Sequence, residues 1–216
     1  MRFLTWACAL AALLLLALVS SIWFLRAAGL PQDRTPVVIE LAGQSLRIDP
    51  AFVRRRNDLL HRQHEEFELV AVWPHLGPAA HVLGQTAAEN IVVISLRKPD
   101  QSLHPADKPG RLYVRFLAEE AVSLEPGLVL RRCLSGSPYE DEAVVMTPPE
   151  GRSFWVRCRP ASLPTVAESS CIGDLRINQL DVSFRLNAVH LKDWPIFVAR
   201  LQSLLDRLAQ LDMAPD

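Results

Sequence analysis

The segment from Phe3 to Leu25 constrains this chain most strongly, because it carries no charged residue over a length that can cross a bilayer. A membrane-spanning helix needs about 20 mainly apolar residues, and this segment is slightly longer. Trp6 and Trp23 would lie about 25 Å apart along such a helix, so both indoles could reach the headgroup layers. Arg2 and Arg26 stand at its two ends. The segment therefore predicts a helix that anchors the chain in a membrane.

A cleaved secretory signal peptide is the alternative, since Ala27-Ala28-Gly29 could serve as its cleavage site. The apolar region of such peptides has about 7–15 residues, which is shorter than the segment found here. Arg26 also stands between the apolar segment and the site. We therefore expect an uncleaved anchor over residues 1–29 and a linker over residues 30–36. Residues 37–216 would then form one α+β domain.

The orientation of the anchor rests on few charges. Arg2 and the terminal amine precede the apolar segment, whereas Arg26 and Arg34 follow it, so the positive-inside rule gives almost no preference. With only two residues ahead of the segment, the arrangement common in bacteria keeps the N-terminus in the cytoplasm. We therefore expect a single-pass protein of the inner membrane with its C-terminal domain in the periplasm.

The cysteines predict one disulfide, because exported domains bridge their thiols and cytosolic ones keep them reduced. Strand alternation places Cys158 with Phe154 and Val156 on an inward face. Cys171 follows after a short loop, so a Cys158–Cys171 bridge would contribute about 3 kcal/mol through loop-closure entropy. The alternative is that these thiols are free and buried. Cys133 could be buried, pair with another chain or replace one of the two partners.

Hydrophobic periodicity predicts an α+β domain, with a mainly antiparallel sheet covered by a C-terminal amphipathic helix. Strands are expected at Val37–Leu41, Leu46–Ile48, Phe67–Trp73, Ile91–Leu96, Leu128–Leu134, Ala143–Met146, Phe154–Cys158, Leu175–Ile177 and Asp181–Leu186. Helices are expected after Asp49-Pro50, over Gly110 to Glu119 and from Trp194 to Leu211. Short turns between the later strands favour an antiparallel meander. We expect the terminal helix to cover its own sheet; the alternative is a face reserved for a partner.

Four histidines lie close together in the sequence and are candidate metal ligands: His61, His64, His75 and His81. His61 and His64 are three residues apart and could share a helix face, with a carboxylate or a third histidine completing a metal site. The HExxH order of zinc proteases is absent from the sequence. The alternative is that the histidines are solvated. We keep them as metal candidates but expect no bound metal.

Motifs for other chemistry are missing from the sequence. It has no GxSxG elbow, P-loop, GxGxxG or CxxC pair, so we expect no catalytic residue and no cofactor. The formal net charge is -1, which excludes binding of polyanions through bulk charge. We therefore expect no nucleic-acid partner.

Arg54, Arg55 and Arg56 form a basic patch in the sequence. The fold could hold this patch against anionic headgroups or against an acidic partner. The alternative is a solvated face that contacts nothing. The patch is the candidate surface contact of the chain.

These observations favour a non-enzymatic interaction or accessory protein of the bacterial envelope, with a membrane anchor, a periplasmic domain and a protein partner. In organisation the chain resembles single-pass bacterial envelope proteins, and this resemblance assigns no role to any residue. One alternative is a small metal-dependent or hydrolytic periplasmic enzyme that uses the stretch from His61 to His81. Another is a periplasmic ligand-sensing domain that acts through a partner.

Overall fold

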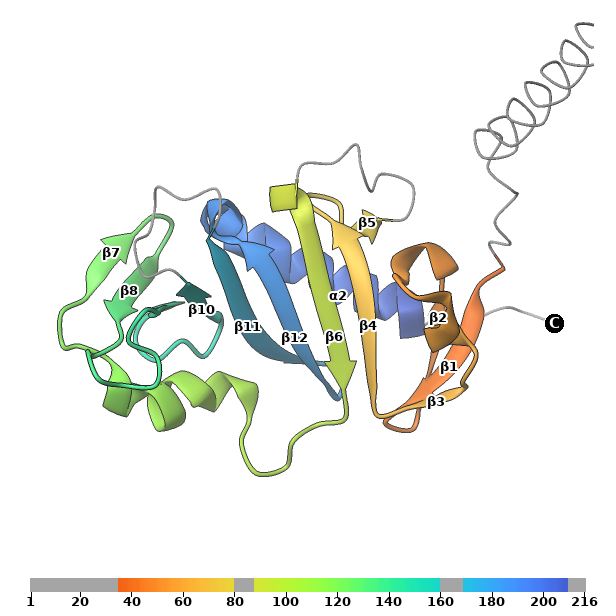
Figure 1. Ribbon diagram of the computed structural model, residues 1–216, viewed down its shortest axis with the longest axis horizontal. Helices are drawn as coiled ribbons and strands as arrows, with labels where there is room; N and C mark the ends of the chain where they lie inside the picture. Colours follow the sequence, from red (N-terminus) through yellow and green to blue (C-terminus); the bar gives the residue numbers. More distant parts are fainter. Residues whose placement is uncertain (1–34, 80–87, 160–168, 210–216) are drawn as a thin grey trace, which may run out of the picture. The chain divides into compact units, whose positions relative to one another are not determined.

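The computed structural model describes residues 35–79, 88–159 and 169–209, which form a mixed α+β fold with a large antiparallel sheet (Figure 1). The strands are β1 (Val37–Leu41), β2 (Gln44–Ile48), β3 (Gln63–His64), β4 (Glu66–Val72), β5 (Gly77–Pro78), β6 (Ile91–Arg97), β7 (Val122–Leu124), β8 (Leu128–Arg132), β9 (Ala143–Met146), β10 (Trp155–Arg159), β11 (Ser170–Ile177) and β12 (Leu180–Asn187). The longest helix of the described residues is α2 (Trp194–Ala209). Short 3₁₀ helices span Pro50–Phe52, Arg56–Leu59, Ala88–Asn90, Pro105–Asp107, Val114–Phe116 and Ala188–Asp193, and a π turn spans Pro109–Tyr113.

The large sheet has nine strands in the order β5-β4-β6-β12-β11-β10-β9-β8-β7, and all neighbours are antiparallel. From β7 to β12 the spatial order repeats the chain order, as short turns require. This part confirms the predicted antiparallel meander. The sequence did not reveal β7, which has only three residues and is largely exposed. It also placed the start of β11 too late, at Leu175 rather than Ser170.

The first hairpin belongs to a separate sheet of order β2-β1-β3. Its two-residue turn holds Ala42 at φ 55° and Gly43 at φ 79°, in the left-handed region that tight hairpin turns need. Glycine adopts this conformation without steric cost. Ile39, Leu41 and Leu46 from β1 and β2 are fully or almost fully buried. The predicted hairpin is therefore present and contributes to the main core.

The helix expected after Asp49 is replaced by two separate 3₁₀ turns. Asp49 does cap the first of them, because its carboxylate accepts a hydrogen bond from the Ala51 amide at 2.8 Å. Val53 then turns to an extended conformation (φ -103°, ψ 127°), which ends this turn. Phe52 and Val53 are both buried, so tertiary burial of adjacent residues outweighs the helical pattern. Leu60, which ends the second turn, is 76% exposed.

The terminal helix α2 packs along one face of the large sheet, behind β4, β6, β11 and β12 in the view of Figure 1. Its apolar side buries Phe197, Leu201, Leu204, Leu205 and Leu208. The Phe197 ring lies 4.8 Å from that of Phe184 on β12, and the Trp194 ring lies 5.2 Å from that of Phe154 (centroid distances). The helix therefore covers its own sheet, as expected.

A second apolar cluster covers the opposite face at the β8–β10 end of the sheet. Strand alternation places Trp155 on the face away from α2, yet its side chain is only 2% exposed. The helical segment before β7 buries it, because the Trp155 indole donates to the Pro105 carbonyl at 2.9 Å and lies 5.3 Å from the Tyr113 ring. This end of the sheet is therefore covered on both faces.

The helix expected over Gly110 to Glu119 is shorter and irregular. A π turn (Pro109–Tyr113) and a 3₁₀ turn (Val114–Phe116) take its place. Leu117 leaves the helical conformation and forms an isolated antiparallel bridge with Cys133. Pairing with the sheet thus ends the helix three residues after Val114.

The predicted anchor over residues 1–29 lies outside the described residues. Among the residues that the structure does describe, no helix combines the length and apolarity needed to cross a bilayer. The boundaries expected for anchor, linker and domain stay predictions. Residues from Thr35 onward form one compact unit.

Candidate binding surface

The face of the large sheet opposite α2 carries polar side chains in rows across β11, β12, β6 and β4. Strand register places Arg176, Asp181, Arg97 and Glu66 in one such row. The next row on the same face consists of Asp174, Ser183, Ser95 and Glu68. Cross-strand neighbours on one face lie close enough to interact directly. This surface is called the open face below, and Figure 1 views the sheet from it.

Asp181 is buried on the open face, with 8% of the residue exposed, and its carboxylate is fully engaged. Arg176 donates to both carboxylate oxygens, at 2.7 and 3.2 Å, and the Asp100 amide donates at 2.7 Å. Arg176 also donates to the Asp100 carbonyl at 2.8 Å. These contacts hold the chain after β6 against the end of β11 and β12.

The Asp174 carboxylate, in the adjacent row, is also bound by side chains of this chain. Lys108 lies 2.7 Å from its carboxylate, and the Ser183 hydroxyl donates to the other oxygen. Arg97 in turn donates to the Ser183 hydroxyl at 2.7 Å. Asp174 and Asp181 therefore have their charges matched from within the chain, which leaves neither carboxylate for an external cation.

Two arginines of the open face line a hollow. Arg54 and Arg185 are both exposed, and neither forms an ion pair within the part of the chain that the structure describes. Both line a hollow of about 290 Å³, together with Glu68, Val93, Ser95, Ile172 and Ser183. A second hollow of about 210 Å³ adjoins it, because Val93 and Arg185 line both. We call the two hollows together the sheet groove.

The three adjacent arginines of the predicted basic patch do not all serve this groove. Arg54 lines it, whereas Arg55 is exposed and does not line either hollow. Of Arg56 only the backbone is described. The basic patch therefore stays a prediction. That Arg54 and Arg185 line the same hollow was not visible in the sequence, because the two residues belong to distant segments.

Of the candidate histidines that the structure describes, His61 and His64 are neighbours, whereas His75 lies beside α2. The His64 ring contacts the His61 carbonyl at 2.9 Å and lines a hollow of about 730 Å³ with Glu40 and Glu65. His75 lies 3.3 Å from Arg200 on α2, and His81 is outside the described residues. Within residues 35–79, 88–159 and 169–209, no three His, Cys, Asp or Glu side chains are grouped so that they could hold a metal ion.

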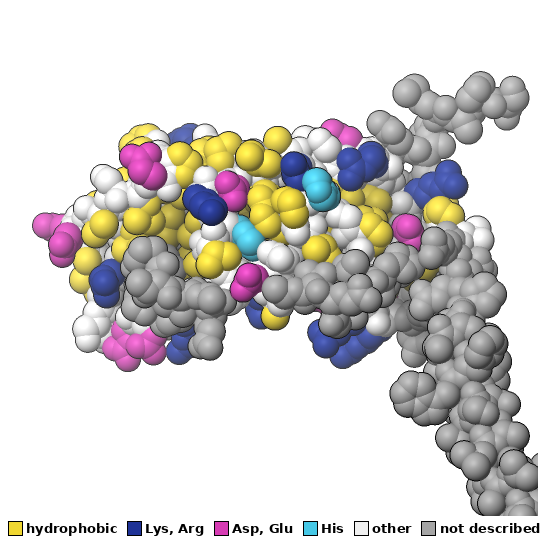
Figure 2. Space-filling view, turned by 90° about the horizontal axis from the view of Figure 1, so that it is seen from above, with side chains coloured by type: hydrophobic (Ala, Val, Ile, Leu, Met, Phe, Trp, Pro, Cys, Tyr) yellow, Lys and Arg dark blue, Asp and Glu magenta, His cyan; other side chains and the backbone are white. Residues whose placement is uncertain are grey.

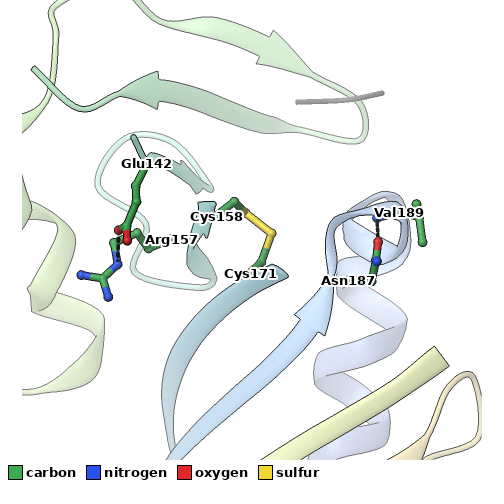
Figure 3. The surroundings of a disulfide bond; sticks show 6 residues. All are labelled: Glu142, Arg157, Cys158, Cys171, Asn187 and Val189. Atoms are coloured by element: carbon green, nitrogen blue, oxygen red, sulfur yellow. Dashed lines mark hydrogen bonds and ion pairs between the residues drawn. A yellow bond between two sulfur atoms is a disulfide. The ribbon is translucent and has the colours of Figure 1, made fainter. Parts of the chain in front are cut away.

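Cys158 and Cys171 form a disulfide, as predicted (Figure 3). They face each other directly across β10 and β11, and both are fully buried. In Figure 3 Arg157 and Glu142 lie beside the bridge as an ion pair, with 2.6 Å between Arg157 Nε and Glu142 Oε2. Beyond β11, Asn187 accepts a hydrogen bond from the Val189 amide at 3.0 Å and so caps the turn before α2.

Cys133 is a free and buried thiol. Burial raises its pKa above the ordinary value, and the nearby Glu142 carboxylate raises it further, while Arg157 acts in the opposite direction. A thiol in this state is a poor nucleophile at neutral pH. Of the alternatives for Cys133, the structure therefore matches burial within this chain.

Two carboxylates have a lowered pKa. The hydroxyl and amide of Ser102 both donate to Asp100 at 2.7 Å and lower the pKa of that exposed carboxylate. Asn178 and Gln202 donate to Asp206, at 2.8 and 2.9 Å, and lower its pKa likewise. The Asp100 contacts close a local turn, whereas Asp206 links α2 to the turn between β11 and β12.

The side of the molecule seen from above in Figure 2 has a different character from the sheet groove. Basic, acidic and histidine side chains lie singly there among apolar ones. Exposed apolar residues near the start of α2 include Val189 (37% exposed) and Ile196 (49%). Scattered exposed apolar side chains are ordinary on protein surfaces, so this side does not indicate a binding site.

Comparisons with known proteins find likeness in fold. No family model matches this chain, and no curated protein matches its sequence. An immunity protein of the Stenotrophomonas maltophilia type IV secretion system is similar at a TM-score of 0.59 and 17% identity, over 81% of this chain and 93% of that one. The iron-regulated outer membrane lipoprotein FrpD of Neisseria meningitidis is similar at a TM-score of 0.51 and 11% identity, over 81% and 92%.

Proposed function

We propose that this chain is a non-enzymatic accessory protein of the bacterial cell envelope that acts by binding another protein. The observation that carries the proposal is the open face, a broad polar surface that α2 leaves uncovered and that contains the sheet groove. Its buried carboxylates are held by internal partners, so the surface is ordered in advance of binding. Pre-ordered polar surfaces lose little entropy when they bind.

Two further findings support an envelope location. The buried Cys158–Cys171 disulfide suits an oxidising compartment, where such bonds persist. The two similar structures are a secretion-system immunity protein and an outer membrane lipoprotein. We extend the proposal to the predicted organisation, with residues 1–29 as inner-membrane anchor, 30–36 as linker and 37–216 as a periplasmic domain.

The proposal is tested by photo-cross-linking in living cells. A benzophenone amino acid at position 68 replaces the exposed Glu68 of the open face, and a matched probe replaces the exposed Ser203 on the outer side of α2. We expect the probe at position 68 to cross-link one envelope protein and the probe at position 203 to give no such product. A chain that forms no cross-link from either position would contradict the proposal.

Immunity is a more specific form of this function, favoured by the fold shared with the immunity protein over almost its whole length. The chain would then bind a toxic protein and block it. The test is to express the cross-linked partner in the periplasm with and without this chain. Growth arrest by the partner alone, relieved by co-expression, is the expected result; a harmless partner would reject immunity and leave the accessory role.

A further inference from the structure

The chemistry of the sheet groove identifies the kind of group that it can bind. The carboxylates deepest on the open face, Asp174 and Asp181, are already paired with Lys108 and Arg176. Arg54 and Arg185 at the groove have no such partner among the described residues. The unmatched charge at the groove is therefore positive, with Glu68 as the one lining carboxylate.

The positions of Arg54 and Arg185 allow one partner segment to contact both. Arg185 stands on β12, whereas Arg54 follows the 3₁₀ turn Pro50–Phe52, which contacts β4, the strand of Glu68. Because β6 lies between these strands, β12 and β4 are roughly 10 Å apart at the usual strand spacing. One short segment of a partner could therefore meet both guanidinium groups.

The groove walls add further contacts. Val93 and Ile172 are half-buried apolar side chains that flank Arg185 in one row, and Ser95 in the adjacent row offers a hydroxyl. A guanidinium beside apolar walls binds a carboxylate more strongly than one in open water, because the local dielectric is lower. Arginine presents a planar fork that matches a carboxylate in two hydrogen bonds.

We infer that the sheet groove is the docking site for an acidic segment of the partner protein, with partner carboxylates bound by Arg185 and Arg54. This inference rests on the proposed function and names the chemistry of its partner. A lipid surface fits less well, because the two arginines line a hollow rather than a protruding surface.

The experiment uses the full chain in detergent micelles and two synthetic peptides as probes. The first is a capped hexapeptide of alternating glutamate and alanine, whose glutamates share one face when extended. The second replaces each glutamate with glutamine. Binding is followed through the arginine Nε–Hε signals in NMR titrations at low salt, where charge contacts are strongest.

Arg54→Gln and Arg185→Gln should each weaken binding of the glutamate peptide about tenfold, as loss of one charged hydrogen-bonding partner does. Arg55→Gln is the matched control, since it removes the same charge from an exposed neighbour outside the groove, and should leave the affinity within about twofold. The glutamine peptide should not bind.

Three results would overturn the inference. One is equal binding of both peptides, and another is unchanged affinity in Arg185→Gln. The third is binding to vesicles that contain phosphatidylglycerol, with no binding of the glutamate peptide, which would assign the groove to lipid. If the cross-linked partner of position 68 is still captured by Arg185→Gln in cells, this inference is wrong while the proposed function stands.

Discussion

Gly173 on β11 shows how tightly single residues are fitted in this sheet. A Cβ at this position would lie 2.5 Å from the Phe184 ring and 2.5 Å from the Trp155 carbonyl oxygen. The ring could shift, but a backbone oxygen in a central strand cannot move without breaking its ladder. The glycine thus lets the neighbouring strand and the ring that supports α2 come close together.

We predict that Gly173→Ala lowers the free energy of unfolding by about 1–3 kcal/mol, the usual cost of overpacking. The measurement is denaturant unfolding of the full chain in detergent. Gly77→Ala is the matched control, because a Cβ there meets no heavy atom within 4 Å, and its unfolding midpoint should stay close to that of the wild type. Equal midpoints for the two variants would show that β11 can relax.

At the scale of elements, the turn between β11 and β12 is fastened to α2 through Asp206. The folded state lowers the pKa of this carboxylate from its ordinary value of 3.8, because Asn178 and Gln202 donate to it. A lowered pKa stabilises the fold above the ordinary value, and this contribution is lost as the pH falls through the folded pKa.

We therefore expect Asp206→Asn to be less stable than the wild type at pH 7 and to approach it in stability as the pH falls below the ordinary carboxyl value of 3.8. Thermal unfolding between pH 2.5 and 7 measures this difference. Ser203→Ala on the same helix should show a difference from wild type that does not vary with pH. A constant difference for Asp206→Asn across the range would mean that the charge plays no part.

The disulfide between β10 and β11 closes a chain segment of 13 residues. We expect its reduction to lower the free energy of unfolding of the wild type by about 3 kcal/mol, through the entropy of the freed unfolded chain. The double variant Cys158→Ala, Cys171→Ala should not respond to reductant. A wild type that unfolds at the same denaturant concentration with and without reductant would contradict this.

The elements that the sequence predicted well are those whose own pattern determines them. The meander and α2 have clear alternation or helical spacing, and the Cys158–Cys171 pair follows from the inward face of one strand. The segments after Asp49 and after Pro105 were predicted less well, because burial against other elements decides their shape. Phe52 and Trp155 are buried by distant segments that no local pattern reveals.

For the whole molecule, the same limit applies to the candidate site. Arg54 was singled out as one of three adjacent arginines, yet its groove partner Arg185 lies on β12 and gave no signal in the sequence. The groove exists because the sheet brings β4, β6, β11 and β12 together. A single sequence does not reveal which distant strands become neighbours in a sheet.

The proposed periplasmic location can be tested with a cysteine placed by the structure. Native cysteines of the domain are poor reporters, because Cys133 is buried and Cys158 is bonded to Cys171. We expect Ser135→Cys, at an exposed position, to react with a membrane-impermeant maleimide in intact spheroplasts, while the wild type does not. Reaction only after permeabilisation would place the domain in the cytoplasm.

The strand order of the large sheet has a consequence for how the chain can fold. Every neighbouring pair except β6 with β12 joins strands that are close along the chain, so two ribbons can form locally. Joining them closes one long loop, between Arg97 and Asp181, which is the main entropic barrier. In pulsed hydrogen exchange, β12 amides that face β11 should be protected before those that face β6. The register of β6 against β12 would be set last, and an error there would misalign β5, β4 and β6 against the other six strands.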